Sequence, residues 1–253
     1  MVLAPAASSS PPAPATPEDG GGRGGAAKRA YVRGLFTAIA PRYDFLNHLL
    51  SFNVDRSWRR KAVARLGWER HPRGRYLDLC AGTLDLAAEL ARRDGFAGTV
   101  MAVDFAIPML VRGRSKAPRT VPLGADALAL PFPSACFDGA LIGFGVRNLA
   151  DLDAGLREAA RVLKPGARLV ILEFATPRAP LLRAAYLFYF RRLLPAIGRL
   201  VSKHRDAYSY LPESVLAFPE PDELARGIAG AGFADVAFER LSGGICVLYH
   251  GAR

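Results

Sequence analysis

Two acidic residues follow apolar stretches that have the composition of β-strands. Asp78 lies in "YLDLCAGTLDLAAEL", residues 76–90, and Asp104 ends "GTVMAVD". The first stretch continues into a turn of small residues and a helical pattern, an arrangement that directs backbone N–H groups toward a cofactor. An acid at the end of the next strand can accept hydrogen bonds from the ribose hydroxyls of an adenosyl cofactor. These residues predict a cofactor site, although a lone acid after a strand can also have a purely structural role.

The turn after the first strand does not fit a dinucleotide. The G-x-G-x-x-G pattern brings a pyrophosphate to a helix N-terminus, but Cys80 and Asp85 occupy two of its glycine positions. Gly82 and Thr83 stay candidates for cofactor contacts, and Thr83 also suits a helix N-cap. Leu84 stands where a third glycine is common. We expect Leu84 to have a right-handed helical backbone and a side chain among apolar neighbours; the alternative is a side chain that narrows the cofactor pocket.

Strand-like and helical stretches alternate along the chain. Strands are expected at 76–79, 98–104, 120–126, 137–144 and 165–174, with a closing pair at 234–240 and 244–252. Helical patterns start near residue 83, after Pro108, and at 152 and 221. Such alternation predicts an α/β, Rossmann-like fold with a mostly parallel sheet and helices on both faces.

Composition divides the chain into two parts. Residues 1–27 are rich in Pro, Ala, Ser and Gly, and we expect a disordered tail because such a segment cannot bury enough apolar surface. Residues 28–253 are expected to form one domain, with an N-terminal helical lid at about 31–66 and a helical insertion at about 179–216. The tail lacks the apolar core of a secretory signal, and no apolar run is long enough to span a bilayer. We therefore expect a cytoplasmic protein.

The net charge of +11 predicts attraction to anionic partners. The insertion "PLLRAAYLFYFRRLLPAIGRLVSKHR" mixes apolar and basic residues, which suits peripheral contact with the inner face of a membrane and equally suits packing on the sheet. No nucleic-acid module is recognisable, so no specific nucleic-acid partner is expected. The three cysteines and four histidines lack metal-ligand spacing, so we expect buried thiols and no metal. The sequence leaves open whether the protein forms a homo-oligomer.

Four blocks occur in a characteristic order and spacing: "LDLCAGTLDL", "AVDFAIPML", "GADALALPFPSACFD" and "RVLKPGARLVILEF". Together they resemble class I S-adenosylmethionine-dependent methyltransferases. The stretches "YDFLNHLLSFNVDRSWRR" and "IGFGVRNLADLDAGLREAARVLKPG" resemble signatures of the ubiquinone/menaquinone biosynthesis C-methyltransferase family. The resemblance implies a seven-stranded sheet with a C-terminal antiparallel pair. It also implies S-adenosylmethionine as the cofactor, contacted by Asp78, Gly82, Thr83, Asp104, Asp126, Ala127 and, through its backbone, Gly143.

The implied reaction is methylation of a ring carbon of a reduced prenylated quinol, from demethylmenaquinol to menaquinol or on a ubiquinol precursor. Arg147 and Asn148 in "GVRN" are the candidates for the reacting end, because a fixed positive charge stabilises a developing phenolate. The alternative is an arginine that ties the loop. Candidate substrate contacts are Tyr43, Asn47, Tyr208 and Tyr210, for which a helix face or core packing is the competing interpretation.

Two other function classes stay open. One is a methyltransferase of the same fold that acts on another small molecule. The other is a non-catalytic binding protein in which Leu84 blocks the cofactor. A measurement of cofactor binding distinguishes the non-catalytic protein from either enzyme. Assays with a panel of reduced quinols distinguish a quinol methyltransferase from one that acts on another small molecule.

Overall fold

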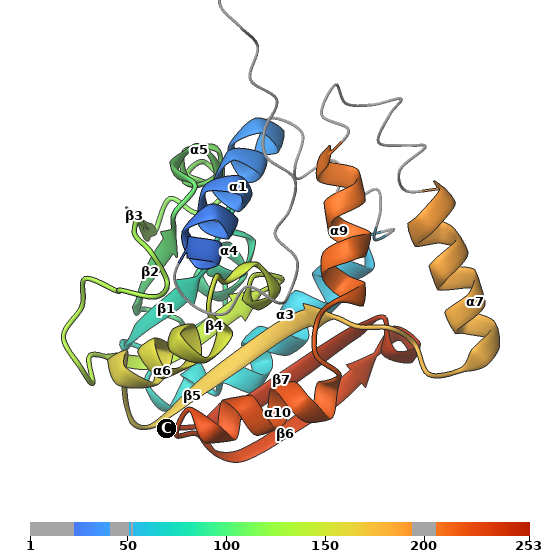
Figure 1. Ribbon diagram of the computed structural model, residues 1–253. Coiled ribbons are helices and arrows are strands. Elements are labelled where there is room, and N and C mark those ends of the chain that lie inside the picture. The colour runs from blue at the N-terminus through green and yellow to red at the C-terminus, as the bar shows by residue number, and fades with distance from the viewer. Residues whose placement is uncertain (1–22, 41–50, 52, 194–205) are drawn as a thin grey trace, which may run out of the picture.

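A seven-stranded sheet runs through the molecule in the order β3-β2-β1-β4-β5-β7-β6 (Figure 1). Strands β1 to β5 pair in parallel, and β7 lies antiparallel between β5 and β6. The expected mostly parallel sheet with a closing antiparallel pair is therefore confirmed. The strands are β1 (Arg75–Leu79), β2 (Thr99–Asp104), β3 (Thr120–Gly124), β4 (Phe137–Gly143), β5 (Leu163–Phe174), β6 (Ala234–Leu241) and β7 (Cys246–Ala252).

This computed structural model describes residues 23–40, 51, 53–193 and 206–253. The candidate contacts Tyr43 and Asn47 lie outside the described residues, as does the side chain of Tyr208. The helices are α1 (Arg23–Ile39), α3 (Val54–Leu66), α4 (Asp85–Ala91), α5 (Ile107–Gly113), α6 (Leu152–Val162), α7 (Pro180–Phe188), α9 (Asp206–Leu216) and α10 (Pro221–Gly230). Shorter helical turns are η2 (Trp68–Arg70), η3 (Val146–Asn148), η4 (Tyr189–Leu193) and η5 (Ser242–Gly244).

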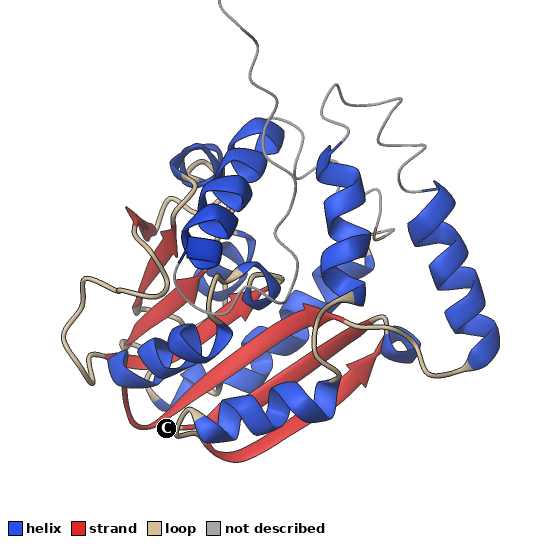
Figure 2. Ribbon diagram, in the orientation of Figure 1, coloured by secondary structure: helices blue, strands red, loops and turns tan. Residues whose placement is uncertain are grey.

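Helices cover both faces of the sheet, as the alternation of the sequence predicts (Figure 2). Side chains of a strand point alternately to its two faces. In β1, Leu77 and Leu79 therefore join the core under α6 and α10, whereas Tyr76 joins the core under α3 and α4. Asp78 shares the face of Tyr76, and this alternation decides what its carboxylate contacts.

The order of the strands determines where a ligand can bind. Strand β1 has β2 on one side and β4 on the other. The chain therefore continues from β1 to β2 and β3 on one side and then crosses to β4 on the other side. In open α/β sheets, the crevice at the carboxyl ends of such strands is the usual ligand site. Helices α1 and α9 stand over this end of the sheet, and α7 projects beside them (Figure 1).

Two boundaries differ from the sequence prediction. Helix α1 begins at Arg23, inside the segment predicted as a tail, because it is anchored on the body: Gly25 lies beside Ala150, and Lys28 bonds to the loop before α6. Helix α4 begins at Asp85 rather than near Thr83.

Two properties of the described part of the chain bear on its surroundings. No helix there is both long and apolar enough to cross a membrane. All three cysteines are free thiols, but Cys80 and Cys136 are half-buried rather than buried, and only Cys246 is enclosed.

Candidate active site

The turn between β1 and α4 has an unusual backbone. Cys80, Gly82 and Leu84 have φ angles of 57°, 51° and 65°. The Leu84 N–H donates to the carbonyl of Ala81 at 2.8 Å and closes the turn. Positive φ is unfavourable for residues with a Cβ, which explains why glycine is common at these positions.

Leu84 differs from the prediction in its backbone but not in its side chain. The expected right-handed backbone is wrong, because the residue precedes the helix as its N-cap in the left-handed region. Its side chain is fully enclosed in the core under α3 and α4. Gly113 of α5 lies so close that a Cβ there would be 2.6 Å from Cγ of Leu84. The side chain therefore points into the core and does not line the cofactor cavity.

A cavity lies at the carboxyl ends of β1, β2 and β4. It holds about 670 Å³ of empty space, its open mouth included. The cofactor residues predicted from the sequence that line it are Gly82, Asp104, Asp126, Ala127 and Gly143. Asn148, predicted for the reacting end, also lines it. Apolar parts of the wall come from Phe36, Val103, Phe105, Met109 and Leu128.

Asp104 is fixed on the cavity wall by two backbone donors. Its Oδ2 accepts from the N–H of Gly82 and its Oδ1 from the N–H of Ala106, both at 2.8 Å. Burial raises the pKa of this carboxyl, and the backbone N–H groups oppose the rise. Each oxygen keeps a further lone pair for a ligand hydroxyl.

Asp78 and Thr83 do not line this cavity. Asp78 points to the other face of β1, where its Oδ2 accepts from the N–H of Ala87 in the first turn of α4 at 2.9 Å. Burial raises the pKa of Asp78 to about 7. Thr83 is enclosed and does not cap the helix, because Leu84 holds that position. The structure thus uses Asp78 to join strand and helix.

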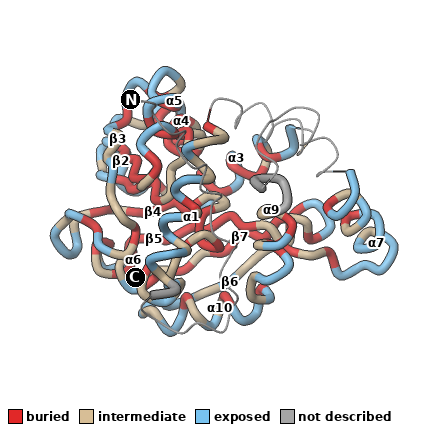
Figure 3. The backbone as a smooth tube through the Cα atoms, turned by 45° about the horizontal axis from the view of Figure 1, so that its top comes forward, coloured by how far each residue is buried: buried red, intermediate tan, exposed pale blue. Residues whose placement is uncertain are grey.

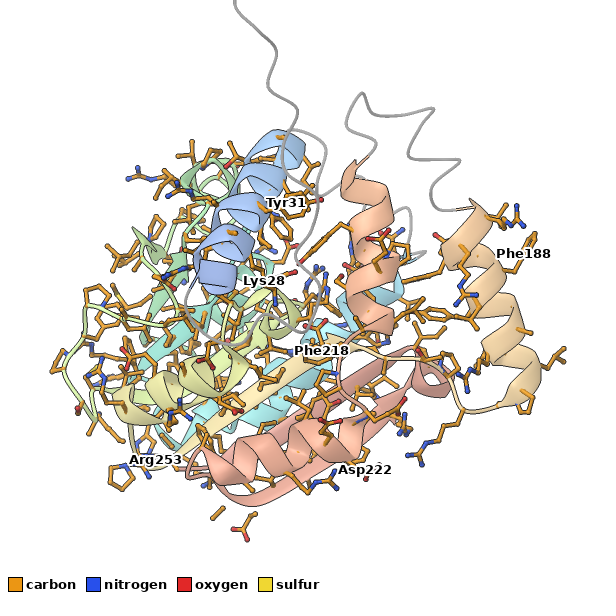
Figure 4. All side chains as sticks on the ribbon, in the orientation of Figure 1. Lys28, Tyr31, Phe188, Phe218, Asp222 and Arg253 are labelled. Atoms are coloured by element: carbon orange, nitrogen blue, oxygen red, sulfur yellow. The ribbon has the colours of Figure 1, made fainter. Side chains whose placement is uncertain are left out.

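Helix α1 lies across the cavity. Nη1 of Arg29 pairs with Oδ2 of Asp126 at 2.6 Å, and Nζ of Lys28 donates to the carbonyl of Leu149 at 2.7 Å. Phe36 of the same helix lines the cavity. Figure 4 shows Lys28 and Tyr31 on the side of α1 that faces α9. The helical lid predicted from about residue 31 is therefore attached to the body by Lys28 and Arg29, which precede residue 31.

Asn148 connects the cavity to helix α9. The hydroxyl of Tyr210 donates to Oδ1 of Asn148 at 2.9 Å, and the ring of Tyr31 meets that of Tyr210 edge-on at 5.8 Å. Burial raises the pKa of Tyr210 to about 12, so the tyrosine keeps its proton at neutral pH. Two of the residues predicted for the substrate end, Asn148 and Tyr210, are thus brought together.

Arg147 precedes Asn148 in η3 and is held by Glu173 at the end of β5. Nη1 of Arg147 donates to Oε1 of Glu173 at 2.6 Å and to the carbonyl of Phe144 at 2.5 Å. The N–H of Phe174 also donates to Oε1, and the N–H of Arg147 donates to Oε2. The side chains of both ion-pair members are nearly or fully enclosed, at 6% and 0% exposed. The guanidinium also lies over the ring of Phe174, 5.5 Å from its centroid.

Sequence reasoning missed Glu173, Lys28, Arg29 and Tyr31. For Glu173 a signal was available, since "VILEF" places an acid at the end of an apolar strand in the same way as Asp104. For the three residues of α1 the sequence gives no such signal, because their contacts lie far along the chain at Asp126, Leu149 and Tyr210.

The sheet order, the switch point and the acid at the end of β2 define a class I S-adenosylmethionine-dependent methyltransferase fold. A solved S-adenosylmethionine-dependent methyltransferase from Thermotoga maritima, described as a possible histamine N-methyltransferase, has the same fold. Its TM-score is 0.60 at 20% identity, over 87% of this chain and 98% of that one.

The sequence matches the ubiE/COQ5 methyltransferase family over residues 25–253, and the chain belongs to this family. A demethylmenaquinone methyltransferase from Thermus thermophilus is 49% identical, over 87% of this chain and 100% of the relative. A ubiquinone/menaquinone biosynthesis C-methyltransferase UbiE from Geobacter sulfurreducens is 46% identical, over 88% of each chain.

The geometry of Leu84 predicts an unusual order of stability for two substitutions. Leu84→Ala should lower the free energy of unfolding by about 2–5 kcal/mol, because it empties part of the core. Leu84→Gly should cost about 1 kcal/mol less, because glycine relieves the left-handed backbone. Denaturant titration measures both, and calorimetry with S-adenosylhomocysteine should give wild-type affinity for each. A tenfold gain in affinity for Leu84→Gly would show that the side chain narrows the pocket.

The Arg147–Glu173 pair predicts that Glu173→Gln destabilises the protein. The three N–H groups around the carboxylate leave no acceptor for the amide NH₂, and the arginine loses its counter-charge. Breaking a buried pair costs about 3–5 kcal/mol. The matched control is Asp222→Asn, which breaks an exposed pair with Arg178 and should cost less than about 1 kcal/mol. Equal, small losses in a denaturant titration would contradict a buried pair.

Proposed function

We propose that the protein transfers a methyl group from S-adenosylmethionine to a ring carbon of a reduced prenylated quinol, with demethylmenaquinol as the acceptor. The single observation that carries this proposal is membership of the ubiE/COQ5 family along nearly the whole domain. Menaquinone is the product common to the names of the two relatives, one a demethylmenaquinone methyltransferase and the other a ubiquinone/menaquinone C-methyltransferase.

The cavity fits the proposed cofactor. Asp104 presents carboxylate oxygens that suit ribose hydroxyls, as the acid after the second strand does in related folds. Phe105, Met109 and Leu128 offer apolar surface for an adenine ring. The wall carries two acids and one arginine, which favours a cationic sulfonium over a pyrophosphate. Because the Leu84 side chain lies in the core, the main reason to consider a non-catalytic protein disappears.

The acceptor must be electron-rich. When bound, S-adenosylmethionine supplies an electrophilic methyl group, so the acceptor has to offer electron density at the ring carbon. A quinone ring is electron-poor, whereas the ring of the reduced quinol is electron-rich at the carbon beside a hydroxyl. Deprotonation of that hydroxyl increases the electron density further, and the ring proton leaves after the transfer.

Arg147 supports the electrostatic part of this reaction. Its guanidinium is always charged, and a fixed positive charge lowers the pKa of a nearby hydroxyl and stabilises a phenolate. Tyr210 keeps its own proton and holds Asn148, so it does not serve as the base. Glu173 is occupied by Arg147 and Phe174 donors. We therefore assign the ring proton to water rather than to either of these side chains.

We also propose that α7 rests on an anionic membrane surface, where a prenylated quinol dissolves. Leu181 and Phe188 are 86% and 60% exposed and share one face of the helix at a spacing of seven residues. Arg183 on the same helix is exposed, as are Arg191 and Arg192 on the adjoining turn η4. Helix α7 projects from the body (Figure 3), and the side chain of Phe188 points outward (Figure 4). Apolar and basic side chains on one exposed helix are the features that anchor a protein at a lipid interface.

Methyl transfer should require a reductant. The protein, S-adenosylmethionine and a short-chain demethylmenaquinone should give methylated product, measured by mass spectrometry, only after reduction with dithionite. The physical reason is the electron demand of the methyl group. Asp104→Asn should weaken cofactor binding and product formation. Asp94 is an exposed aspartate in the turn after α4, so Asp94→Asn should leave both unchanged. Equal turnover of the oxidised quinone would contradict the proposed acceptor.

Binding to vesicles should depend on α7. The protein should co-sediment with vesicles that contain phosphatidylglycerol more than with pure phosphatidylcholine, and salt should release it, because screening shortens electrostatic reach to about 8 Å at physiological ionic strength. The double variant Leu181→Ser/Phe188→Ser should bind at least about tenfold more weakly, since each buried side chain contributes about 1.5–3 kcal/mol.

Val111→Ser is the matched control for the vesicle experiment. Val111 lies on α5 and is 68% exposed, so its replacement by serine removes exposed apolar surface away from α7. It should bind vesicles like the wild type. An equal loss in the control, or wild-type binding by the double variant, would rule out α7 as the contact.

A further inference from the structure

Two buried hydrogen-bond donors near the reacting end have no partner among the described residues. They are Nε of Arg147 and the hydroxyl of Tyr186 on α7. Both atoms are shielded from solvent, and Tyr186 as a whole is 5% exposed. Buried polar groups are nearly always hydrogen-bonded, and a buried donor left unpaired costs stability. Two such donors therefore call for an acceptor that the described residues do not supply.

The two donors share a neighbour. The guanidinium of Arg147 lies over the ring of Phe174, 5.5 Å from its centroid. Tyr186 belongs to a small apolar cluster with Phe190 and Val215, and Phe174 packs against the same cluster. Phe174 thus contacts the arginine and packs against the cluster that contains the tyrosine. It also stacks on Phe144, with ring centroids 4.5 Å apart, and Phe144 lines the cofactor cavity.

We propose that the Tyr186 hydroxyl and Nε of Arg147 form a donor pair that binds one ring oxygen of the acceptor. This inference rests on the proposed function, which supplies an aromatic ring with hydroxyl groups. It adds a substrate-positioning residue on α7, a helix that the sequence assigns only to packing or to membrane contact. The ring oxygen is held beside Phe144 and Phe174, next to the cavity wall that receives the cofactor.

The charge states of the surrounding groups suit this arrangement. Burial raises the pKa of Tyr186 far above neutrality, so its O–H stays a donor, and the nearby positive charge of Arg147 opposes the rise. Glu173 occupies Nη1 of Arg147 together with the Phe144 carbonyl, which leaves Nε as a free donor. A phenolate oxygen that accepts from a tyrosine and an arginine gains from a charge-assisted hydrogen bond. Glu173 is therefore the positioning residue for Arg147.

Unpaired guanidinium nitrogens also occur at Arg93 and Arg240, but they lack this setting. Arg93 follows the last turn of α4 and pairs with Glu89, and Arg240 lies on the edge strand β6. Neither of them lies over the Phe174 ring. Arg147 is distinguished by the second donor on Tyr186 and by its contact with Phe174, which stacks on the cavity residue Phe144.

Tyr186→Phe tests the donor pair, and Tyr189→Phe, three residues along on the continuation of the same helix, is the matched control. The first measurement is kcat/KM for a reduced short-chain demethylmenaquinone. The second is calorimetric binding of 1-naphthol, a stable ring with one hydroxyl, in the presence of S-adenosylhomocysteine. Tyr186→Phe should lower both values about tenfold, equivalent to about 1.4 kcal/mol. Its affinity for S-adenosylhomocysteine should not change, and its melting temperature should not fall, because an unpaired buried hydroxyl is removed.

Each outcome decides a different point. If Tyr186→Phe binds 1-naphthol and turns over like the wild type, the donor pair is wrong and the hydroxyl is only an unpaired group. If the wild type binds 1-naphthol through Tyr186 but methylates no reduced quinol, the donor pair stands and the proposed acceptor is wrong. If the wild type neither binds 1-naphthol nor turns over, both are overturned. Equal losses in Tyr189→Phe would contradict a specific role for Tyr186.

Discussion

The buried ion pair between Arg147 and Glu173 joins the ends of β4 and β5, which carry residues of the proposed acceptor region. Arg147 follows β4, Glu173 lies at the end of β5, and the carboxylate accepts both side-chain and backbone donors. Such a pair is costly to desolvate, so its geometry has to be well satisfied. The pair holds the loop that carries Asn148, and Arg147 lies over the ring of Phe174, which stacks on Phe144. The cofactor cavity and the proposed acceptor region are therefore built on the same pair of strands.

Segments far apart in the sequence complete the site around this support. Helix α1 contributes Lys28, Arg29 and Tyr31, which contact the loop before α6, Asp126 and α9. Helix α7 has two different faces: Tyr186 turns inward to the aromatic cluster, while Phe188 is exposed. If the exposed face rests on lipid, the inward face meets an acceptor that enters from the same side. The helix would then connect membrane contact to ring binding.

The fold was predictable from the sequence because each element carries its own pattern. Alternating apolar residues and helical spacing identify the strands and helices, and the order of the signature blocks identifies the methyltransferase family. The directions of the side chains were harder to predict than the strands and helices. Asp78 was predicted on the cavity wall, but the alternation of β1 turns it toward α4. The backbone of Leu84 was predicted in the right-handed helical region, but the turn places it in the left-handed region. The contacts of α1 and the pairing of Glu173 depend on tertiary distances that local patterns do not encode.

We propose that this site methylates a ring carbon of a reduced quinol and not one of its oxygens. The most direct test uses S-adenosylmethionine labelled with ¹³C in the transferred methyl group and dithionite-reduced demethylmenaquinone. The site of attachment in the purified product is then read by NMR. We expect the labelled methyl group to show long-range coupling to ring carbons on both sides and no attachment to oxygen. A labelled methoxy group, or label transfer that proceeds equally without reductant, would contradict the account.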